Sequence, residues 1–233
     1  MSGVFDDISR VTLIDDTLQK RKAGRPPKSA IGKSVRHRFL EVGTELVRSN
    51  GLRHLTIGEV SRRVGVAKST FYVHFSSRED LLVAVLHEYS SSLFHDAKAA
   101  ARFVPRGLHR LVRMIEVWIQ HYVIKHGGCL LLSGSVEYAG LADNETRAVM
   151  VEMVRSWRTL LAAQIQDAVH LGALSNDLDV EQMLFEIFSL VLGVQHDCRF
   201  LGEPIGFRVA MLHAVFERHG AELPPGAPVR LRI

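Results

Sequence analysis

Apolar residues recur every three or four positions along almost the whole of this 233-residue chain, and no stretch alternates clearly between apolar and polar. A repeat near 3.6 residues places an apolar stripe on one face of a helix, whereas a half-buried strand needs a repeat of two. Apolar residues make up 47% of the chain, which is enough for a sizeable core. The pattern therefore predicts an all-α protein of about nine helices.

Glycine, proline and capping residues divide this pattern into elements. Asn50-Gly51 ends the first helix, Gly65 ends a second, Ser77 can cap a third, and Pro105 marks a fresh start. The segments expected to be helical are 35–50, 57–64, 66–75, 78–101, 105–126, 129–139, 142–171, 180–201 and 206–219. Three short helices at the front would thus be joined by a long one to a larger bundle.

Basic residues are concentrated in the first third of the chain. Between positions 20 and 75, thirteen lysines and arginines stand against three glutamates, a balance of +10, whereas the whole chain carries +4. A basic end joined to a mildly acidic remainder is typical of a nucleic-acid-binding end attached to a domain with another task. A merely solvated basic surface is the alternative that charge alone leaves open.

The sequence also argues against export and membrane insertion. The first 19 residues carry four aspartates and no apolar run, so they do not form a secretory signal. The most apolar stretch, 187–194, is far shorter than the roughly 20 residues of a membrane span. Two cysteines, Cys129 and Cys198, are too few for a disulfide framework and are expected to be reduced thiols. We expect a soluble, cytoplasmic, nucleoid-associated protein with no membrane partner.

Residues 56–75 have the pattern of a helix-turn-helix. Thr56 and Glu59 are spaced as a capping box, in which Glu59 would reach back to the Thr56 N–H. Gly65 allows a sharp turn, and the small Ser61 lets two helices cross closely. The second helix would expose short and long polar groups, suited to base edges and phosphates, at Lys68, Ser69, Thr70, Tyr72 and His74. Its inward side would carry Val66, Phe71 and Phe75.

The stretch 38–82, RFLEVGTELVRSNGLRHLTIGEVSRRVGVAKSTFYVHFSSREDLL, closely resembles the DNA-binding domain of the TetR family of bacterial transcriptional regulators. The matching positions are Gly51, Thr56-Ile57, Gly65-Val66, Thr70, Tyr72, His74-Phe75, Ser77, Glu79 and Leu81. Ala67 departs from the family, which usually has a serine there to cap the recognition helix, and Ser61, Ser69 and Arg78 replace the common alanine, glycine and lysine. Beyond residue 100 the order of helices is similar to the ligand-binding and dimerisation half of the family.

The resemblance implies a role for each matching residue. The major groove would be read by Lys68, Ser69 and Thr70; phosphates would be held by Tyr72 and His74; Thr56 and Arg78 would anchor the two ends of the motif; and Lys33 and Arg36 would lie near phosphates. It also implies a homodimer on double-stranded DNA, at a palindromic operator, with repression relieved by an unknown small-molecule effector. The expected parts are a disordered extension with a basic arm over 1–30, a helix-turn-helix domain over 31–77, a ligand-binding and dimerisation domain over 78–220, and a flexible tail over 221–233.

The stretch KRKAGRPPK, residues 20–28, precedes this domain. Gly24-Arg25-Pro26 resembles the core of short hooks that lie in A·T-rich minor grooves, where proline keeps the chain extended and arginine meets the enhanced negative potential. We hypothesise an arm that places Arg25 in the minor groove. Non-specific phosphate attraction remains the alternative.

Residues in the back half of the chain are candidates for an effector pocket or, alternatively, for a metal site. Aromatic bodies with a few polar handles suit a small molecule, so the candidate pocket residues are Trp118, Tyr122, Cys129, Tyr138, Trp157 and Phe188, although each could equally be plain core. A metal-responsive regulator would instead gather ligands from His121, His126, Cys129, His196 and Cys198. An effector-free architectural DNA-binding protein is a further alternative. No phosphate loop, nucleophile elbow or carboxylate-bearing metal motif is present, so we expect neither an enzyme nor a cofactor.

Overall fold

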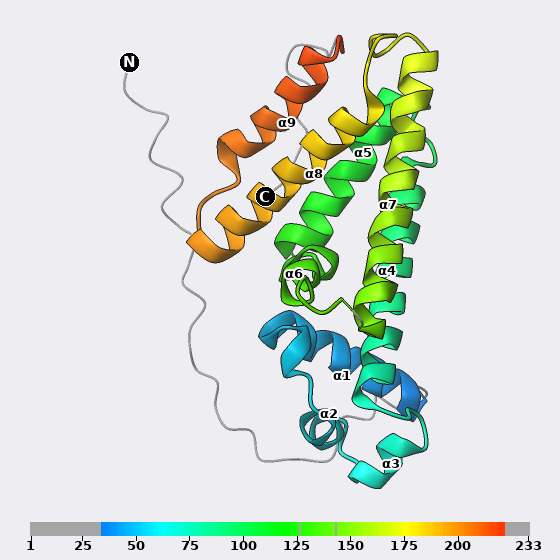
Figure 1. The fold of residues 1–233 in the computed structure, drawn as a ribbon, viewed down its shortest axis with the longest axis vertical. Coiled ribbons are helices and arrows are strands. Elements are labelled where there is room, and N and C mark those ends of the chain that lie inside the picture. The colour runs from blue at the N-terminus through cyan, green and yellow to red at the C-terminus, as the bar shows by residue number, and fades with distance from the viewer. Residues whose placement is uncertain (1–33, 126, 143, 222–233) are drawn as a thin grey trace. The chain divides into compact units, whose positions relative to one another are not determined.

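The computed structural model describes residues 34–125, 127–142 and 144–221 (Figure 1). Over these ranges the chain forms nine α-helices and no strand, which confirms the all-α prediction. The helices are α1 (Val35–Asn50), α2 (Ile57–Val64), α3 (Lys68–Tyr72), α4 (Arg78–Ala101), α5 (Leu108–Val117), α6 (Leu130–Glu137), α7 (Glu145–His170), α8 (Val180–His196) and α9 (Gly206–Arg218). None of the described helices is long and apolar enough to cross a membrane.

Three further segments are helical but not α-helical. A 3₁₀ turn, η2 (Leu52–His54), follows α1, and two π-helical segments, η3 (Trp118–Lys125) and η4 (Asp197–Leu201), continue α5 and α8. The single helices expected over 105–126 and 180–201 therefore each change their hydrogen-bond pattern part of the way along. The recognition helix is shorter than the expected 66–75, because only Lys68–Tyr72 is α-helical.

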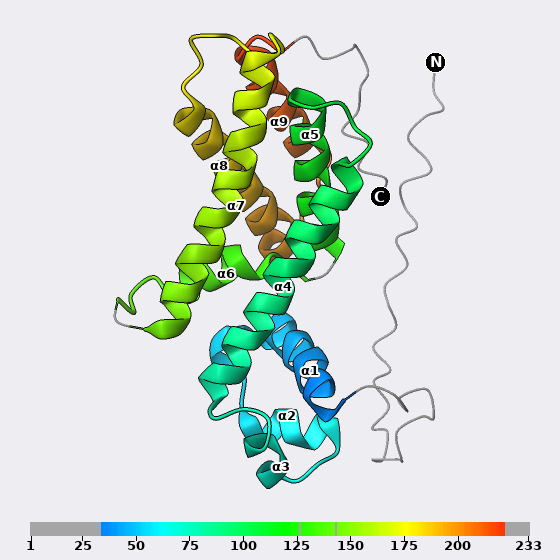
Figure 2. The ribbon, with the colours of Figure 1, turned by 90° about the vertical axis from the view of Figure 1, so that its right-hand side faces the viewer.

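The first three helices pack around the start of α4 (Figure 2). Phe39 of α1 is fully buried, and its ring meets those of Phe71 and Phe75 edge-on at centroid distances of 5.4 and 6.0 Å. Edge-to-face aromatic pairs at such distances stabilise a core beyond the area that they bury. These three rings hold α3 against α1, as the inward assignment of Phe71 and Phe75 predicted.

The capping box of α2 differs from the sequence expectation. The Thr56 hydroxyl accepts the Glu59 N–H at 3.3 Å, as expected. The Glu59 carboxylate, however, accepts from the side chains of Arg62 and Arg63 at 2.7–2.9 Å. Two guanidinium groups within the next turn offer charge-assisted bonds, which are stronger than a bond to a neutral N–H.

Side-chain caps also begin the long helices. Ser77, Asn144 and Asp179 each accept an N–H from the first turn of α4, α7 and α8. At α4 the Asp80 carboxylate reaches back one residue further than a capping box requires, and it accepts the Ser76 N–H at 2.8 Å. Each cap satisfies N–H groups that a helix leaves unpaired.

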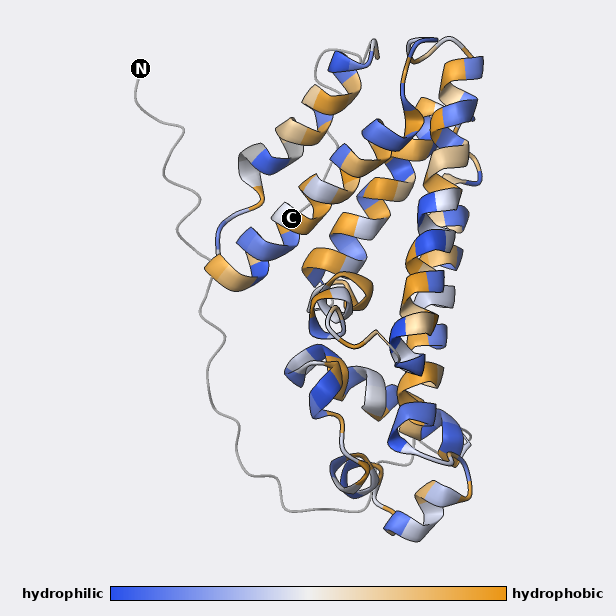
Figure 3. Cartoon of the chain, viewed as in Figure 1, coloured by the Kyte–Doolittle hydropathy of each residue, from blue (hydrophilic) through white to orange (hydrophobic). Residues whose placement is uncertain are grey.

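Helices α4, α5, α7 and α8, together with η3, enclose the C-terminal core. In Figure 3 the hydrophobic colouring is strong on α5 and α8. The rings of Trp118 and Trp157 are buried there and meet edge-on at 5.6 Å. Residues from Ser34 onward group as one compact unit, and the division into 31–77 and 78–220 stays a prediction.

Candidate functional site

The helix-turn-helix consists of α2, a turn at Gly65, and α3. Gly65 adopts the left-handed conformation, with φ 79° and ψ 36°, and the Val66 N–H returns to the Ser61 carbonyl at 3.1 Å. A residue with a Cβ enters this conformation only at a cost, so glycine suits the turn. Ser61 is buried, as its predicted place between two helices requires. The turn sets α3 against α2, and the Lys68 side chain of α3 lies over Gly58 of α2.

Helix α3 presents its polar residues outward because Phe71 is fully buried beneath it. Lys68, Ser69 and Tyr72 are exposed, and Thr70 is half-buried on the same short helix. Tyr72 keeps 59% of its surface exposed although its ring meets Phe71 edge-on at 5.5 Å. The predicted base-reading and phosphate-binding groups of α3 are therefore accessible together.

Val73, directly after α3, is 77% exposed, and no sequence pattern pointed to it. It follows the exposed Tyr72 and precedes the half-buried His74, whose ring lies 6.0 Å from that of Phe39. Exposed apolar side chains on a DNA-reading surface can contact thymine methyl groups. Val73 is identified only by its exposure in the structure. Helical periodicity does not predict the orientation of a residue that follows a five-residue helix.

Two further predicted phosphate contacts border α3. Thr56, at the N-cap of α2, is exposed beside the unpaired N–H groups of a helix start, a place that suits an anion. The exposed Arg36 places its guanidinium carbon 5.0 Å from the centre of the Phe75 ring. Lys33 and Arg25, with the proposed arm over 20–28, lie outside the described residues.

Arg78 has a different environment from the other predicted DNA contacts. Its Nε donates to the Leu55 carbonyl at 2.7 Å and its Nη2 to the Leu52 carbonyl at 2.8 Å. Its Nη1 donates to Glu79 at 2.7 Å. The guanidinium thus ties the start of α4 to the segment between α1 and α2, and its role at DNA stays a prediction.

An ion network joins α2 to α1. Arg63 donates to Glu59 and, at 2.9 Å, to Glu45 of α1. The hydrogen bonds from Arg62 and then Arg63 lower the pKa of Glu59 to about 2. Glu59 is therefore ionised at neutral pH and holds both arginines at the end of α2.

Four of the six predicted pocket residues pack on one another instead of facing an open space. Trp118 meets Trp157 and, at a centroid distance of 4.9 Å, Phe188. Its indole N–H points to the Cys129 sulfur at 3.4 Å. In the described structure these side chains fill the core, which is the alternative that the sequence left open.

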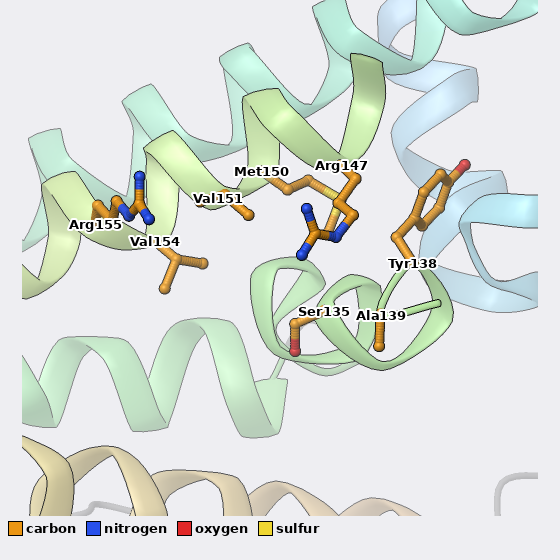
Figure 4. A pocket seen from close by; sticks show the side chains of 8 residues that line it. All are labelled: Ser135, Tyr138, Ala139, Arg147, Met150, Val151, Val154 and Arg155. Atoms are coloured by element: carbon orange, nitrogen blue, oxygen red, sulfur yellow. The ribbon is translucent and has the colours of Figure 1, made fainter. Parts of the chain in front are cut away.

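Tyr122 and Tyr138 do line cavities. The Tyr122 hydroxyl donates to Asp96 at 2.6 Å, and burial followed by this bond raises the pKa of Tyr122. Tyr122 borders a cavity of about 130 Å³ next to Tyr89 and Arg48. Tyr138 lines a larger cavity of about 380 Å³ between α6 and α7 (Figure 4).

A metal site finds no support in the described ranges, where no three histidine, cysteine or acidic side chains are grouped to hold an ion. Cys129 is buried and Cys198 partly buried, and both are free thiols. His126, one of the ligands considered from the sequence, lies outside the described residues.

The end of the chain exposes apolar side chains over three consecutive elements. These are Phe185 and Leu192 of α8, Phe200 and Leu201 of η4, and Met211 of α9. We refer to these five residues as the α8–α9 surface. α8 packs against α9, so the two helices present their outer sides next to each other. A group of large apolar side chains on neighbouring helices marks an interaction surface.

Comparisons with known families match both halves of the chain. Residues 39–85 match the family described as bacterial regulatory proteins, tetR family, and residues 107–214 match the tetracyclin repressor-like C-terminal domain. The transcriptional regulator AcuR of Cereibacter sphaeroides is 26% identical over 170 residues, which are 71% of this chain and 76% of AcuR. The HTH-type transcriptional repressor KstR2 of Rhodococcus jostii is 24% identical over 160 residues, 67% of this chain and 76% of KstR2.

Solved structures share the fold. A TetR-family regulator from Cytophaga hutchinsonii superposes with a TM-score of 0.67 at 18% identity, over 78% of this chain and 91% of that one. FadR of Bacillus subtilis, crystallised with stearoyl-CoA, superposes with a TM-score of 0.62 at 17% identity, over 78% and 95% of the two chains. At these identities the likeness concerns the fold alone.

Proposed function

The chain belongs to the TetR family of bacterial regulatory proteins, and from this membership we propose that it is a homodimeric repressor. As a DNA-binding transcriptional regulator it would bind a palindromic operator and leave it when a small molecule binds among the C-terminal helices. The observation that carries the proposal is the exposure of Lys68, Ser69 and Tyr72 on a short helix that Phe71 anchors from beneath. The relative KstR2, whose name describes a repressor, supports the sign of regulation.

On DNA, α3 would enter the major groove. Lys68, Ser69 and Thr70 offer donors and acceptors for base edges, while Tyr72 and His74 contact phosphates. Thr56 adds a phosphate contact at the start of α2, next to the helix dipole. Arg36, seated on Phe75, would hold a phosphate at the flank of the motif.

The α8–α9 surface would be covered by a second copy of the chain. Isologous pairing places the same surface of each protomer across a two-fold axis, and that symmetry matches a palindromic operator. Gly193 and Ala210 are exposed on the same two helices, and small residues let helices approach closely. Apolar side chains on both helices provide the buried area that such a pair needs.

Release by an effector requires that the ligand bind two arrangements of the protein with different affinities. The long helix α4 belongs to both halves, because it packs on α1 at one end and on α5 and α7 further along. A ligand that favours one packing of the bundle would therefore change the placement of α3. The crystal of FadR with stearoyl-CoA illustrates that a protein of this fold takes an organic ligand.

Selection of bound fragments from random DNA by the full-length protein tests the proposal. We expect an enriched inverted repeat with half-sites about one helical turn apart. Replacing Thr70 and Tyr72 with alanine should weaken binding to that repeat more than about tenfold without unfolding the protein, since neither side chain is fully buried. Enriched sequences without two-fold symmetry, or full affinity in the double variant, would contradict it. A reporter promoter that overlaps the operator then gives the sign, because a repressor lowers expression.

A further inference from the structure

The cavity between α6 and α7 has the features of a ligand site (Figure 4). Its volume, about 380 Å³, lies within the range of small-molecule pockets and near the lower end of that range. One wall is a stripe of α7 formed by Arg147, Met150, Val151, Val154 and Arg155. The spacing of these residues places them on one helix face, so a single rigid element presents them all.

The charged groups of this cavity are both cationic. The guanidinium groups of Arg147 and Arg155 have no ion pair or side-chain hydrogen bond within the described part of the chain, and the described lining contains no acidic residue. Figure 4 shows the Arg147 side chain reaching across the cavity towards Ser135. An unpaired guanidinium that lies at an apolar wall suits a carboxylate, which accepts two parallel N–H bonds.

Apart from Ser135, whose hydroxyl donates to the Leu132 carbonyl at 2.7 Å, the rest of the lining is apolar or aromatic. Met150, Val151 and Val154 line the α7 side, and the Tyr138 ring and Ala139 line the α6 side. We propose that this cavity binds a small organic carboxylate with an apolar body. Its acid group would be held by Arg147, while Arg155, two turns further along α7, adds positive charge to the same cavity. The inference deepens the proposed function and rests on it, because it names the chemical class of the effector.

The floor of the cavity touches the DNA-reading half of the chain. Gly134 of α6 lies so close to Met150 that an added Cβ would collide with the Met150 methyl group, and it would stand 3.1 Å from Leu52 Cδ2. Met150, Gly134 and Leu52 therefore form one continuous contact from the cavity to η2. A ligand that displaces Met150 acts directly on this contact, because a close-packed interior transmits displacement.

Two polar links join the end of α6 to the same segment. The Glu137 carboxylate accepts the Leu52 and Arg53 N–H groups at 3.2 and 3.0 Å. The Tyr138 hydroxyl lies near the Arg78 guanidinium, which in turn donates to the Leu52 carbonyl at 2.8 Å. The end of α6 is thus linked to η2, the segment that leads into α2, and α6 also forms a wall of the cavity.

Binding is measured by calorimetry on the full-length protein without DNA. The probes are octanoate and 4-phenylbutanoate, each paired with its uncharged amide. Each carboxylate should bind once per chain, and each amide about tenfold or more weakly, because it offers no charged partner to the arginines. Binding of neither carboxylate, or equal binding of acid and amide, overturns the proposal.

Variants locate the site. Arg147→Gln with Arg155→Gln should lower carboxylate affinity about tenfold or more, and Ala139→Trp should abolish binding by filling the cavity. Arg102→Gln, which removes an exposed arginine that directly follows α4 and lies outside the cavity, should leave binding unchanged. Full affinity in the double variant, with its thermal unfolding preserved, overturns the placement.

The link to DNA is tested separately on the selected operator. Glu137→Gln should keep carboxylate affinity within about twofold but reduce the release of operator by the carboxylate. Each carboxylate oxygen accepts one N–H, and the NH2 group that replaces one of these oxygens cannot accept. Glu152→Gln, an exposed change on α7, serves as the matched control. An unchanged response in Glu137→Gln overturns the route through η2. Carboxylate binding without operator release in the unmodified protein would count against the proposed function, since binding itself is measured without DNA.

Discussion

Tyr72 allows the phosphate contact and the packing of the recognition helix to be separated. Its ring rests edge-on against Phe71, and its side chain is more than half exposed. Tyr72→Phe keeps the ring contact and removes only the hydroxyl. We expect unchanged thermal unfolding and a loss of operator affinity of about tenfold, the effect of one hydrogen bond to a charged group. Electrophoretic mobility shifts with the selected operator measure this, and an unaltered affinity would remove Tyr72 from the phosphate contacts.

At the scale of single residues, the sequence predicted the orientation of side chains that a motif or a helical period determines. Phe71 and Phe75 follow from their spacing on a helix whose other face is polar. The bonds of Arg78 could not be predicted, because its carbonyl partners Leu52 and Leu55 lie more than twenty positions away. The sequence likewise could not predict that the Glu59 carboxylate bonds Arg62 and Arg63 instead of the Thr56 N–H. That outcome depends on side-chain rotamers, which residue spacing does not determine.

At the scale of the element, the recognition helix α3 has no side-chain cap, and we predict that adding one would stabilise the protein. Ala67 has the extended backbone of an N-cap, φ −67° and ψ 153°, but offers no acceptor to the first N–H groups of α3. Ala67→Ser should raise the free energy of unfolding by about 1 kcal/mol. Urea denaturation measures it, with Ala99→Ser as the control. That exposed position lies inside α4, where serine is a weaker helix former, so the change should be neutral or destabilising.

Helix α2 should show a pH dependence that originates in Glu59. Arg62 and Arg63 hold the pKa of this carboxyl at about 2, below its ordinary 4.5, so the folded state favours its charged form. The resulting stabilisation is present above about pH 4.5 and is lost as the pH falls towards 2. The stability difference between the unmodified protein and Glu59→Gln should therefore be constant near neutrality and shrink below pH 4.5.

Urea midpoints measured from pH 7 to pH 3 give this difference. Glu152→Gln, which removes an exposed carboxylate of α7, is measured beside it as the control. Because the ion pairs of Glu59 are solvent-exposed, 1 M salt should reduce the effect. A difference that does not depend on pH would mean that the arginines do not stabilise the folded state through Glu59.

The π-helical segments show what helical periodicity cannot resolve. η3 and η4 differ from an α-helix by a hydrogen bond to the fifth residue instead of the fourth, a change of register that leaves a similar apolar stripe over five to eight residues. The sequence therefore predicted helices across both segments but not their form. η3 carries Trp118 and Tyr122, two residues for which a pocket role was considered.

At the scale of the whole molecule, the sequence indicated the architecture better than the cavity. The nine α-helices of the described ranges stand in the expected order, because periods and caps act locally. The cavity between α6 and α7 depends on which side chains leave space once the helices have packed, and aromatic content pointed instead to Trp118, Trp157 and Phe188, which fill their space with one another. Tyr138, named from the sequence as one of these aromatic residues, does line the cavity. Arg147 and Arg155 also line it, but nothing in the sequence distinguished them from ordinary surface arginines.

The last prediction tests whether the α8–α9 surface is the dimer interface. Leu192 and Phe185 are 46% and 65% exposed on α8, so a glutamate at either position costs the protomer little. Within a dimer the same glutamate would be buried without a partner, which is strongly unfavourable. We therefore expect Leu192→Glu and Phe185→Glu to keep their helical circular dichroism, to sediment as monomers, and to bind the full operator at least tenfold more weakly while retaining affinity for a half-site. Leu171→Glu changes a leucine that is 63% exposed and lies outside this surface, and this variant should remain dimeric. Dimers that persist in both α8 variants would place the partner on another face of the protein.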